Sequence, residues 1–173
     1  MLAAAAFSLG NAAIGLAGSN ADDPESVADY AAEIALSAAL IAAAAAFVFL
    51  RRCDAGRSRK VGKFGWTVSA GGAALAGIGN FFENGLGVSA FGLVFAFGGL
   101  ALLIGLASAG IAVLASAPPW RWLGVGLTVF AAGIAVGEEP GFGLIGLTWI
   151  AVAALLAGRA GPFRPDEIAA SSA

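Results

Sequence analysis

The side chains best suited to chemistry in this sequence are a few carboxylates and one amide close to predicted turns. Glu83 and Glu139 each lie in a glycine-containing turn, and Asn80 precedes Glu83 by one helical turn. Glu33 follows Asp29 at the i,i+4 spacing that puts two residues on one helix face. Carboxylates and amides grouped at a membrane surface concentrate cations or exchange protons. We therefore take Glu83, Glu139, Asn80 and Glu33 as candidate ligands of an ion or a proton.

A structural interpretation accounts for the same residues. Helix-ending turns require polar residues and glycine, and an extracytoplasmic loop tolerates acids. Transporters more often bind their substrates near the middle of the membrane, at broken helices, whereas the apolar segments of this chain are neutral at their centres. We favour this interpretation and predict no catalytic residue.

The composition excludes several other kinds of chemistry. The sequence has no His, which is the commonest metal ligand and general base, and Cys53 is its single cysteine, so no intramolecular disulfide can form. The glycine-rich segments lack the Lys-Ser/Thr pair of a phosphate-binding loop. We therefore predict no metal, no cofactor and no nucleic-acid partner.

Six apolar segments must position the candidate residues. The 173 residues are 60% hydrophobic and only 12% charged, and roughly 20 apolar residues suffice to cross a bilayer as a helix. The segments cover residues 2–18, 27–50, 64–82, 88–116, 120–137 and 142–158, separated by turn residues or charges. The sequence predicts an all-α integral membrane protein. Its single domain, residues 1–160, is a bundle of six transmembrane helices, followed by a short cytoplasmic tail, 161–173.

The first segment has two interpretations. It is either a retained helix or the apolar region of a secretory signal that is cleaved near residue 21. No Lys or Arg precedes the apolar run, as a signal peptide would require. We favour a retained helix.

The charges predict the orientation of the bundle. All the basic residues fall on one side of the six-segment topology; they are Arg51, Arg52, Arg57, Arg59, Lys60, Lys63, Arg121, Arg159 and Arg164. Short loops rich in Lys and Arg face the cytoplasm. Both termini are therefore predicted to be cytoplasmic, in the inner membrane of a bacterium or archaeon. The first six of these residues form a loop that we expect to contact anionic lipid headgroups.

Tryptophans are expected at membrane interfaces. Trp66, Trp120 and Trp122 lie where segments start on the cytoplasmic side, which predicts an interfacial belt. Trp149 is the exception because it falls near the middle of the last segment. Its two interpretations are a packing or lipid-facing aromatic, which we favour, and a contact to a pigment or quinone.

A weak internal repeat and stripes of small residues suggest how the bundle is built. Shifting the sequence by 56 positions pairs Trp66 with Trp122 and Glu83 with Glu139, which predicts helical hairpin repeats. Small residues at i,i+4 spacing, which allow helices to approach closely, are expected to hold the bundle together; they are Gly133 with Gly137, and Ala101 with Gly105 and Ala109.

These observations leave two functions open. The first, which we favour, is a non-enzymatic structural or accessory component of the membrane, with the lipid bilayer and another membrane protein or a second copy as partners. The alternative is a small permease or channel for a cation, a proton or a small solute, with an acidic outer mouth.

Overall fold

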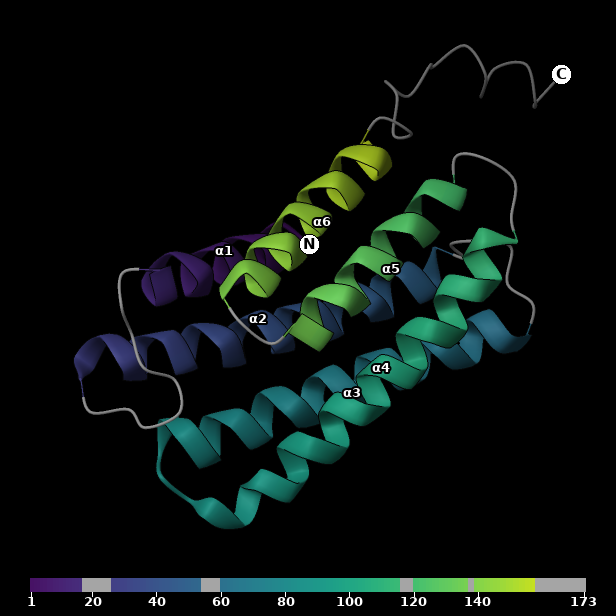
Figure 1. Cartoon of the computed structure of the whole chain (residues 1–173). Helices are drawn as coiled ribbons and strands as arrows, with labels where there is room; N and C mark the ends of the chain where they lie inside the picture. The colour runs from purple at the N-terminus through teal and green to yellow at the C-terminus, as the bar shows by residue number, and fades with distance from the viewer. Residues whose placement is uncertain (17–25, 54–59, 116–119, 137–138, 158–173) are drawn as a thin grey trace, which may run out of the picture.

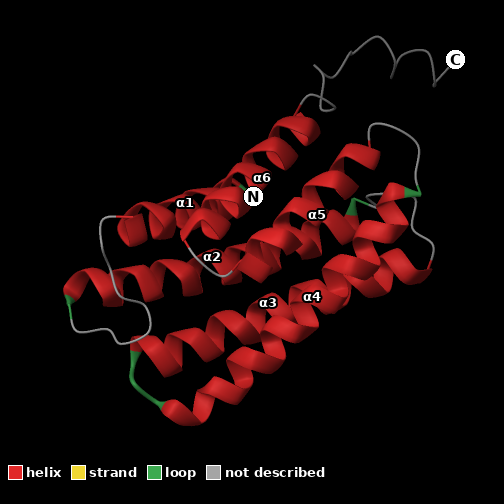
Figure 2. Ribbon diagram, viewed as in Figure 1, coloured by secondary structure: helices red, strands yellow, loops and turns green. Residues whose placement is uncertain are grey.

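The protein folds into six α-helices within the residues that its structure describes. The computed structural model describes residues 1–16, 26–53, 60–115, 120–136 and 139–157. The helices are α1 (Leu2–Leu16), α2 (Val27–Arg52), α3 (Lys60–Asn80), α4 (Gly92–Leu114), α5 (Trp120–Val136) and α6 (Glu139–Ala157). A π-helical turn, η1 (Phe81–Gly85), and a 3-10 turn, η2 (Ser89–Phe91), connect α3 to α4. The all-helical prediction is confirmed for these residues (Figure 2); the predicted tail, 161–173, lies outside them.

The composition of α2 and the capping residues at its N-terminus explain why this helix forms and where it begins. Alanine, the best helix former, dominates this segment. Ser26 caps the helix: its hydroxyl accepts a hydrogen bond from the backbone N–H of Asp29 at 3.2 Å. In return the Asp29 carboxylate accepts one from the backbone N–H of Ser26 at 2.7 Å. This capping box satisfies N–H groups that a helix start leaves without intrahelical partners. Asp29 therefore has a structural role as part of the cap of α2.

The six helices form a closed ring. Each packs against its neighbours in the chain, and α6 packs against α1. The helices run alternately in opposite directions, as Figure 1 shows. The start of α1 and the end of α6 therefore lie at the same end of the bundle as the end of α2 and the start of α3.

Charges separate between the two ends of this bundle. Among the described residues, the basic side chains lie where α2 ends and where α3 and α5 begin; they are Arg51, Arg52, Lys60, Lys63 and Arg121. The acidic residues Asp29, Glu33, Glu83 and Glu139 lie towards the opposite ends of their helices. We call these the basic end and the acidic end. The fold therefore preserves the charge separation seen along the sequence.

Within the described residues, two helices are long and apolar enough to cross a membrane: Val27–Arg52, and Ser89–Leu114, which joins η2 to α4. The described parts of α1, α5 and α6 contain shorter apolar stretches, Leu2–Ile14, Arg121–Ile134 and Gly143–Ala157. α3 has 21 residues, but its many glycines, with Thr67, Ser69 and Asn80, lower its mean hydropathy. Six helices were expected to qualify as spans; among the described residues, the short apolar lengths of α1, α5 and α6 and the composition of α3 reduce that number to two.

Helices α3 and α4 pack with their backbones in contact. A Cβ atom added at Gly72 would collide with the backbone of Leu102, and one added at Gly98 would collide with the backbone of Ala76. The predicted stripe behaves in the same way, because Gly105 faces the backbone of Ser69 and Ala109 faces Gly65. Its role inside the bundle is thereby confirmed for Gly105 and Ala109; Gly137 lies outside the described residues.

An aromatic cluster lies in the core of the ring. The ring of Phe47 lies 6.1 Å from that of Trp66, 6.0 Å from Phe130 and 5.3 Å from Trp149, measured between centroids. Trp66 is only 1% exposed, so the prediction that it lies in an interfacial belt is wrong: it packs on Phe47 from the adjacent helix. Trp122 is 68% exposed. The internal repeat gains no support, because these two paired tryptophans have opposite environments.

Candidate functional site

A buried polar cluster joins α2 to α3 near the acidic end. Glu33 is 3% exposed and Asn80 is fully buried. The Asn80 side-chain amide donates to the Glu33 carboxylate (Nδ2 to Oε2, 2.8 Å), to the backbone oxygen of Glu33 at 3.1 Å and to the Ser37 hydroxyl at 3.0 Å. The Ser37 hydroxyl donates in turn to the backbone oxygen of Glu33 at 2.9 Å. Two of the predicted ligands, Glu33 and Asn80, are therefore brought together.

The π-helical turn adds a second amide to this cluster. η1 begins directly after Asn80 and carries Asn84, whose side-chain amide donates to Asn80 Oδ1 at 3.0 Å and to Glu33 Oε2 at 3.4 Å. Single π-helical turns occur frequently at functional sites. Asn84 was missed at the sequence level, although its i,i+4 spacing from Asn80 was a usable signal.

The chemistry of this cluster follows from the direction of its hydrogen bonds. Two amide groups point N–H donors at one carboxylate oxygen of Glu33, whereas hard cations such as Ca²⁺ and Mg²⁺ are bound by several converging oxygens. Within the described residues, no group of three His, Cys, Asp or Glu side chains is placed to hold a metal ion. The arrangement suits a hydrogen-bonded clamp between helices, or a site for a proton, better than a cation cage.

Of the other two predicted ligands, Glu83 makes no hydrogen bond to this cluster within the described residues. The Glu83 carboxylate lies against Gly92, the first residue of α4, where a negative charge is favoured by the helix dipole. Glu139 is the first residue of α6, and its side chain lies outside the described part of the chain. The acidic outer rim stays a prediction, because only the Glu83 side chain of this pair is described.

The predicted lipid-binding residues lie at the basic end. Arg51 and Arg52 end α2, Lys60 begins α3 and Lys63 follows one turn later, and all four are exposed. Arg57 and Arg59 fall in the segment 54–59, outside the described residues. The four exposed side chains are free to reach a lipid headgroup.

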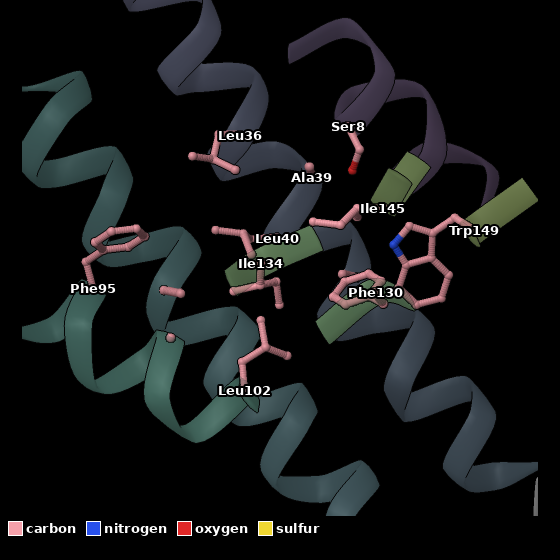
Figure 3. Close-up of a pocket in the computed structure, with 13 residues that line it drawn as sticks. Ser8, Leu36, Ala39, Leu40, Phe95, Leu102, Phe130, Ile134, Ile145 and Trp149 are labelled. Carbon is pink, nitrogen blue, oxygen red and sulfur yellow. The ribbon is translucent and has the colours of Figure 1, made fainter. Parts of the chain in front are cut away.

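A cavity of about 300 Å³ lies at the centre of the ring. All six helices contribute to its wall. Figure 3 shows mostly hydrocarbon side chains around it, with the hydroxyl of Ser8 and the indole of Trp149 on the same side in this view. Both residues are only 2% exposed. The central cavity is thus apolar with a polar group at one side.

Among the residues that the structure describes, the buried Trp149 indole N–H has no hydrogen-bond partner. In Figure 3 its nitrogen is on the edge of the ring that faces the cavity. The neighbouring rings of Phe47 and Phe130 hold the indole in place, with centroids 5.3 and 5.5 Å away. Buried N–H donors are nearly always paired, so an unpaired one needs an explanation. The favoured packing role of Trp149 is thereby confirmed. Packing does not explain why its indole N–H is buried without a hydrogen-bond acceptor among the described residues.

Comparison with known proteins adds no functional information. No protein-family model matches the chain, and no match was found among curated proteins or among solved structures.

Proposed function

We propose that this chain is a multi-pass protein of a bacterial or archaeal cytoplasmic membrane that acts as a non-enzymatic structural or accessory component. The observation that carries the proposal is the distribution of apolar residues over the bundle. Large apolar side chains are exposed on all six helices, among them Phe7, Ile41, Leu75, Leu93, Phe97, Ile111, Val125 and Leu147. A soluble bundle would instead place charged side chains on these outer faces. Exposed apolar surface of this extent is typical of contact with lipid or with a membrane partner.

The interior supports the same proposal. The buried set contains many small residues together with polar ones; the polar and charged members are Ser8, Asn11, Asp29, Glu33, Ser37, Ser69, Asn80 and Thr148. In lipid, helix association depends on close packing through small residues and on hydrogen bonds between helices. The contact of α3 with α4 and the cluster of Glu33 with Asn80 are these two kinds of interaction.

Shorter helices are compatible with six membrane spans. The 15 residues of α1 reach about 22 Å at 1.5 Å per residue, which is less than the ~30 Å of hydrocarbon in an average bilayer. A short span is accommodated by local thinning of the bilayer, by an upright helix or by oligomerisation. The 26 residues of α2 are long enough to cross the membrane while tilted.

The single cysteine allows a direct test of orientation. Cys53 is exposed at the basic end, which the proposal places in the cytoplasm. A membrane-impermeant maleimide should leave Cys53 unlabelled in intact spheroplasts and label it after lysis. The matched control is Leu86→Cys in a Cys53→Ser background, because Leu86 is exposed at the acidic end. This variant should be labelled in intact spheroplasts, and the reverse pattern would refute the proposed orientation.

The accessory role is tested by purification from the native membrane in a mild detergent. The proposal expects a stoichiometric membrane protein or a second copy of this chain to co-purify. Isolation of a monomer without any partner would count against an accessory role and would indicate that the bundle is stable in the membrane without a protein partner.

A permease or channel is the second candidate, and the buried Glu33 carboxyl favours it. Ionisable groups inside membrane helices are costly and are frequently part of proton pathways. If the chain conducts protons or cations, Glu33→Gln should abolish flux into liposomes that contain the purified protein. Glu83→Gln is the control, since the Glu83 carboxylate, from η1, lies against Gly92 and makes no described hydrogen bond to this cluster. If the flux is unchanged in Glu33→Gln, Glu33 is not the site that carries the proton or cation.

A further inference from the structure

The central cavity combines an apolar wall with hydrogen-bonding groups at one side. We infer that it binds a small lipid-soluble molecule that has an apolar body and a carbonyl oxygen. The oxygen accepts hydrogen bonds from the Trp149 indole and the Ser8 hydroxyl. This inference goes beyond the proposed structural or accessory role, and it depends on the cavity rather than on the orientation of the helices in a membrane.

The polar atoms determine which functional group fits. An indole N–H is a donor only, and a hydroxyl can also donate. Trp149 Nε1 has no partner within the described structure, and Figure 3 shows it on the same side of the cavity as the Ser8 oxygen. A carbonyl oxygen has two lone pairs and can accept from both groups at once. A ligand that offers only donors would leave the indole unpaired.

The size and lining of the cavity exclude water as a sufficient occupant. The cavity measures about 300 Å³, the lower end of the range for small-molecule sites, whereas one water takes up about 30 Å³ in the liquid. A buried water also needs two to four polar partners. Beyond Ser8 and Trp149, the described side chains that line the cavity are hydrocarbon, among them Leu36, Phe95, Leu102, Phe130 and Ile134. An apolar body is needed to fill this space.

The site is held rigidly. Phe130 contacts the Trp149 ring edge-on, with an interplanar angle of 82°, and Phe47 packs on the same indole. Both rings are buried. A donor that is fixed before the ligand arrives loses little conformational freedom on binding. The carbonyl oxygen therefore meets a preformed partner, and its removal from the ligand should weaken binding measurably.

A pair of ligands that differ only in their carbonyl groups tests the inference. The full chain in lipid nanodiscs is titrated with 2,3-dimethyl-1,4-naphthoquinone and with 2,3-dimethylnaphthalene, and binding is measured by calorimetry against empty nanodiscs. Both ring positions of the quinone are blocked, so it does not alkylate the exposed Cys53. We expect the quinone to bind at least tenfold more tightly than the hydrocarbon. Equal affinities, or no binding of either compound beyond empty nanodiscs, would overturn the inference.

Variants assign the effect to the indole. Trp149→Phe keeps an aromatic ring but removes one of the two donors, and should lower the affinity for the quinone about fivefold, towards that of the hydrocarbon. Trp122→Phe is the matched control, because Trp122 is exposed and does not line the cavity. If Trp149→Phe lowers the melting temperature of the free protein, Ser8→Ala provides the same test from the other donor. A quinone affinity that is unchanged in both Trp149→Phe and Ser8→Ala would refute the site.

A second titration identifies the source of the carbonyl group. Methyl decanoate carries an ester carbonyl on a flexible chain, and the naphthoquinone carries ring ketones. Tighter binding of the quinone would indicate a quinone-like lipid, and tighter binding of the ester would indicate an acyl lipid. Either result supports the inference if Trp149→Phe weakens the binding of the compound that binds more tightly.

Discussion

Replacing Gly72 by alanine should force α3 and α4 apart. The added Cβ would lie 2.8 Å from the Cα of Leu102 and 2.8 Å from the carbonyl oxygen of Gly98. Carbon atoms in contact prefer about 3.5–4.0 Å, so the helices must separate by about 0.7 Å or more at this point. A gap of 0.5–1 Å loses roughly a quarter to a half of the dispersion energy between the atoms it separates. The opposing atoms are backbone and cannot rotate away.

The neighbouring glycine provides the reference for this change. Gly71 is exposed, and a Cβ there would have no atom within 4 Å beyond its own helix. Gly71→Ala should therefore stabilise the protein by about 0.5–1 kcal/mol, through helix propensity alone. Overpacking of a tight interface costs about 1–3 kcal/mol, and the rigid backbone places Gly72→Ala near the upper limit. After the same propensity gain, Gly72→Ala should destabilise the protein by about 2 kcal/mol.

The assay is reversible unfolding of each purified variant in mixed detergent micelles by added SDS, followed by circular dichroism. The free energy of unfolding should fall for Gly72→Ala and rise slightly for Gly71→Ala. The pair on α4 repeats the test from the opposite helix, because a Cβ at Gly98 meets the backbone of Ala76 and one at Gly99 meets nothing within 4 Å. Equal stabilities of Gly72→Ala and Gly71→Ala would show that the two backbones are not in contact there.

Two further changes test the polar cluster and the aromatic core. Asn80→Ala removes the hydrogen bonds to Glu33 and Ser37 and should lower the free energy of unfolding by about 1–2 kcal/mol. Asn84→Ala loses one hydrogen bond to Asn80 at 3.0 Å and a 3.4 Å contact to the Glu33 carboxylate, so it should cost less; the reverse order in the same SDS titration would contradict the cluster. Phe47→Ala should cost about 3–5 kcal/mol as a large-to-small core change, while the exposed Phe49→Ala should change the melting temperature little; similar losses for both would contradict the buried aromatic cluster.

Much of the helical layout was predictable because its causes are local. Apolar runs, turn residues and capping residues act within a few positions of one another, so all six helices were expected from the sequence. The seven-residue spacing of Gly65, Gly72 and Gly79 was missed at the sequence level. A residue seven positions further along a helix returns to nearly the same face, so this spacing was a usable signal for a smooth face on α3, although it does not identify the helix that packs there.

The candidate site was predictable only in part. The sequence grouped Asn80 with Glu83 because they are one turn apart, and Glu33 with Asp29 for the same reason. In the structure, Asn80 hydrogen-bonds to Glu33, and Glu83 lies against Gly92. Local spacing identifies which residues share a helix face, whereas the side chains that face them come from a helix distant in the sequence.

The sequence by itself determined that this chain forms apolar helices rich in small residues, with basic and acidic residues at opposite ends. These properties depend on composition and on charges next to each helix. The tertiary structure decided that α6 closes the ring on α1, that Trp66 is buried, and that Trp149 directs its N–H to a central cavity. A cavity forms between side chains of several helices, and its shape depends on how they pack, which no single segment encodes.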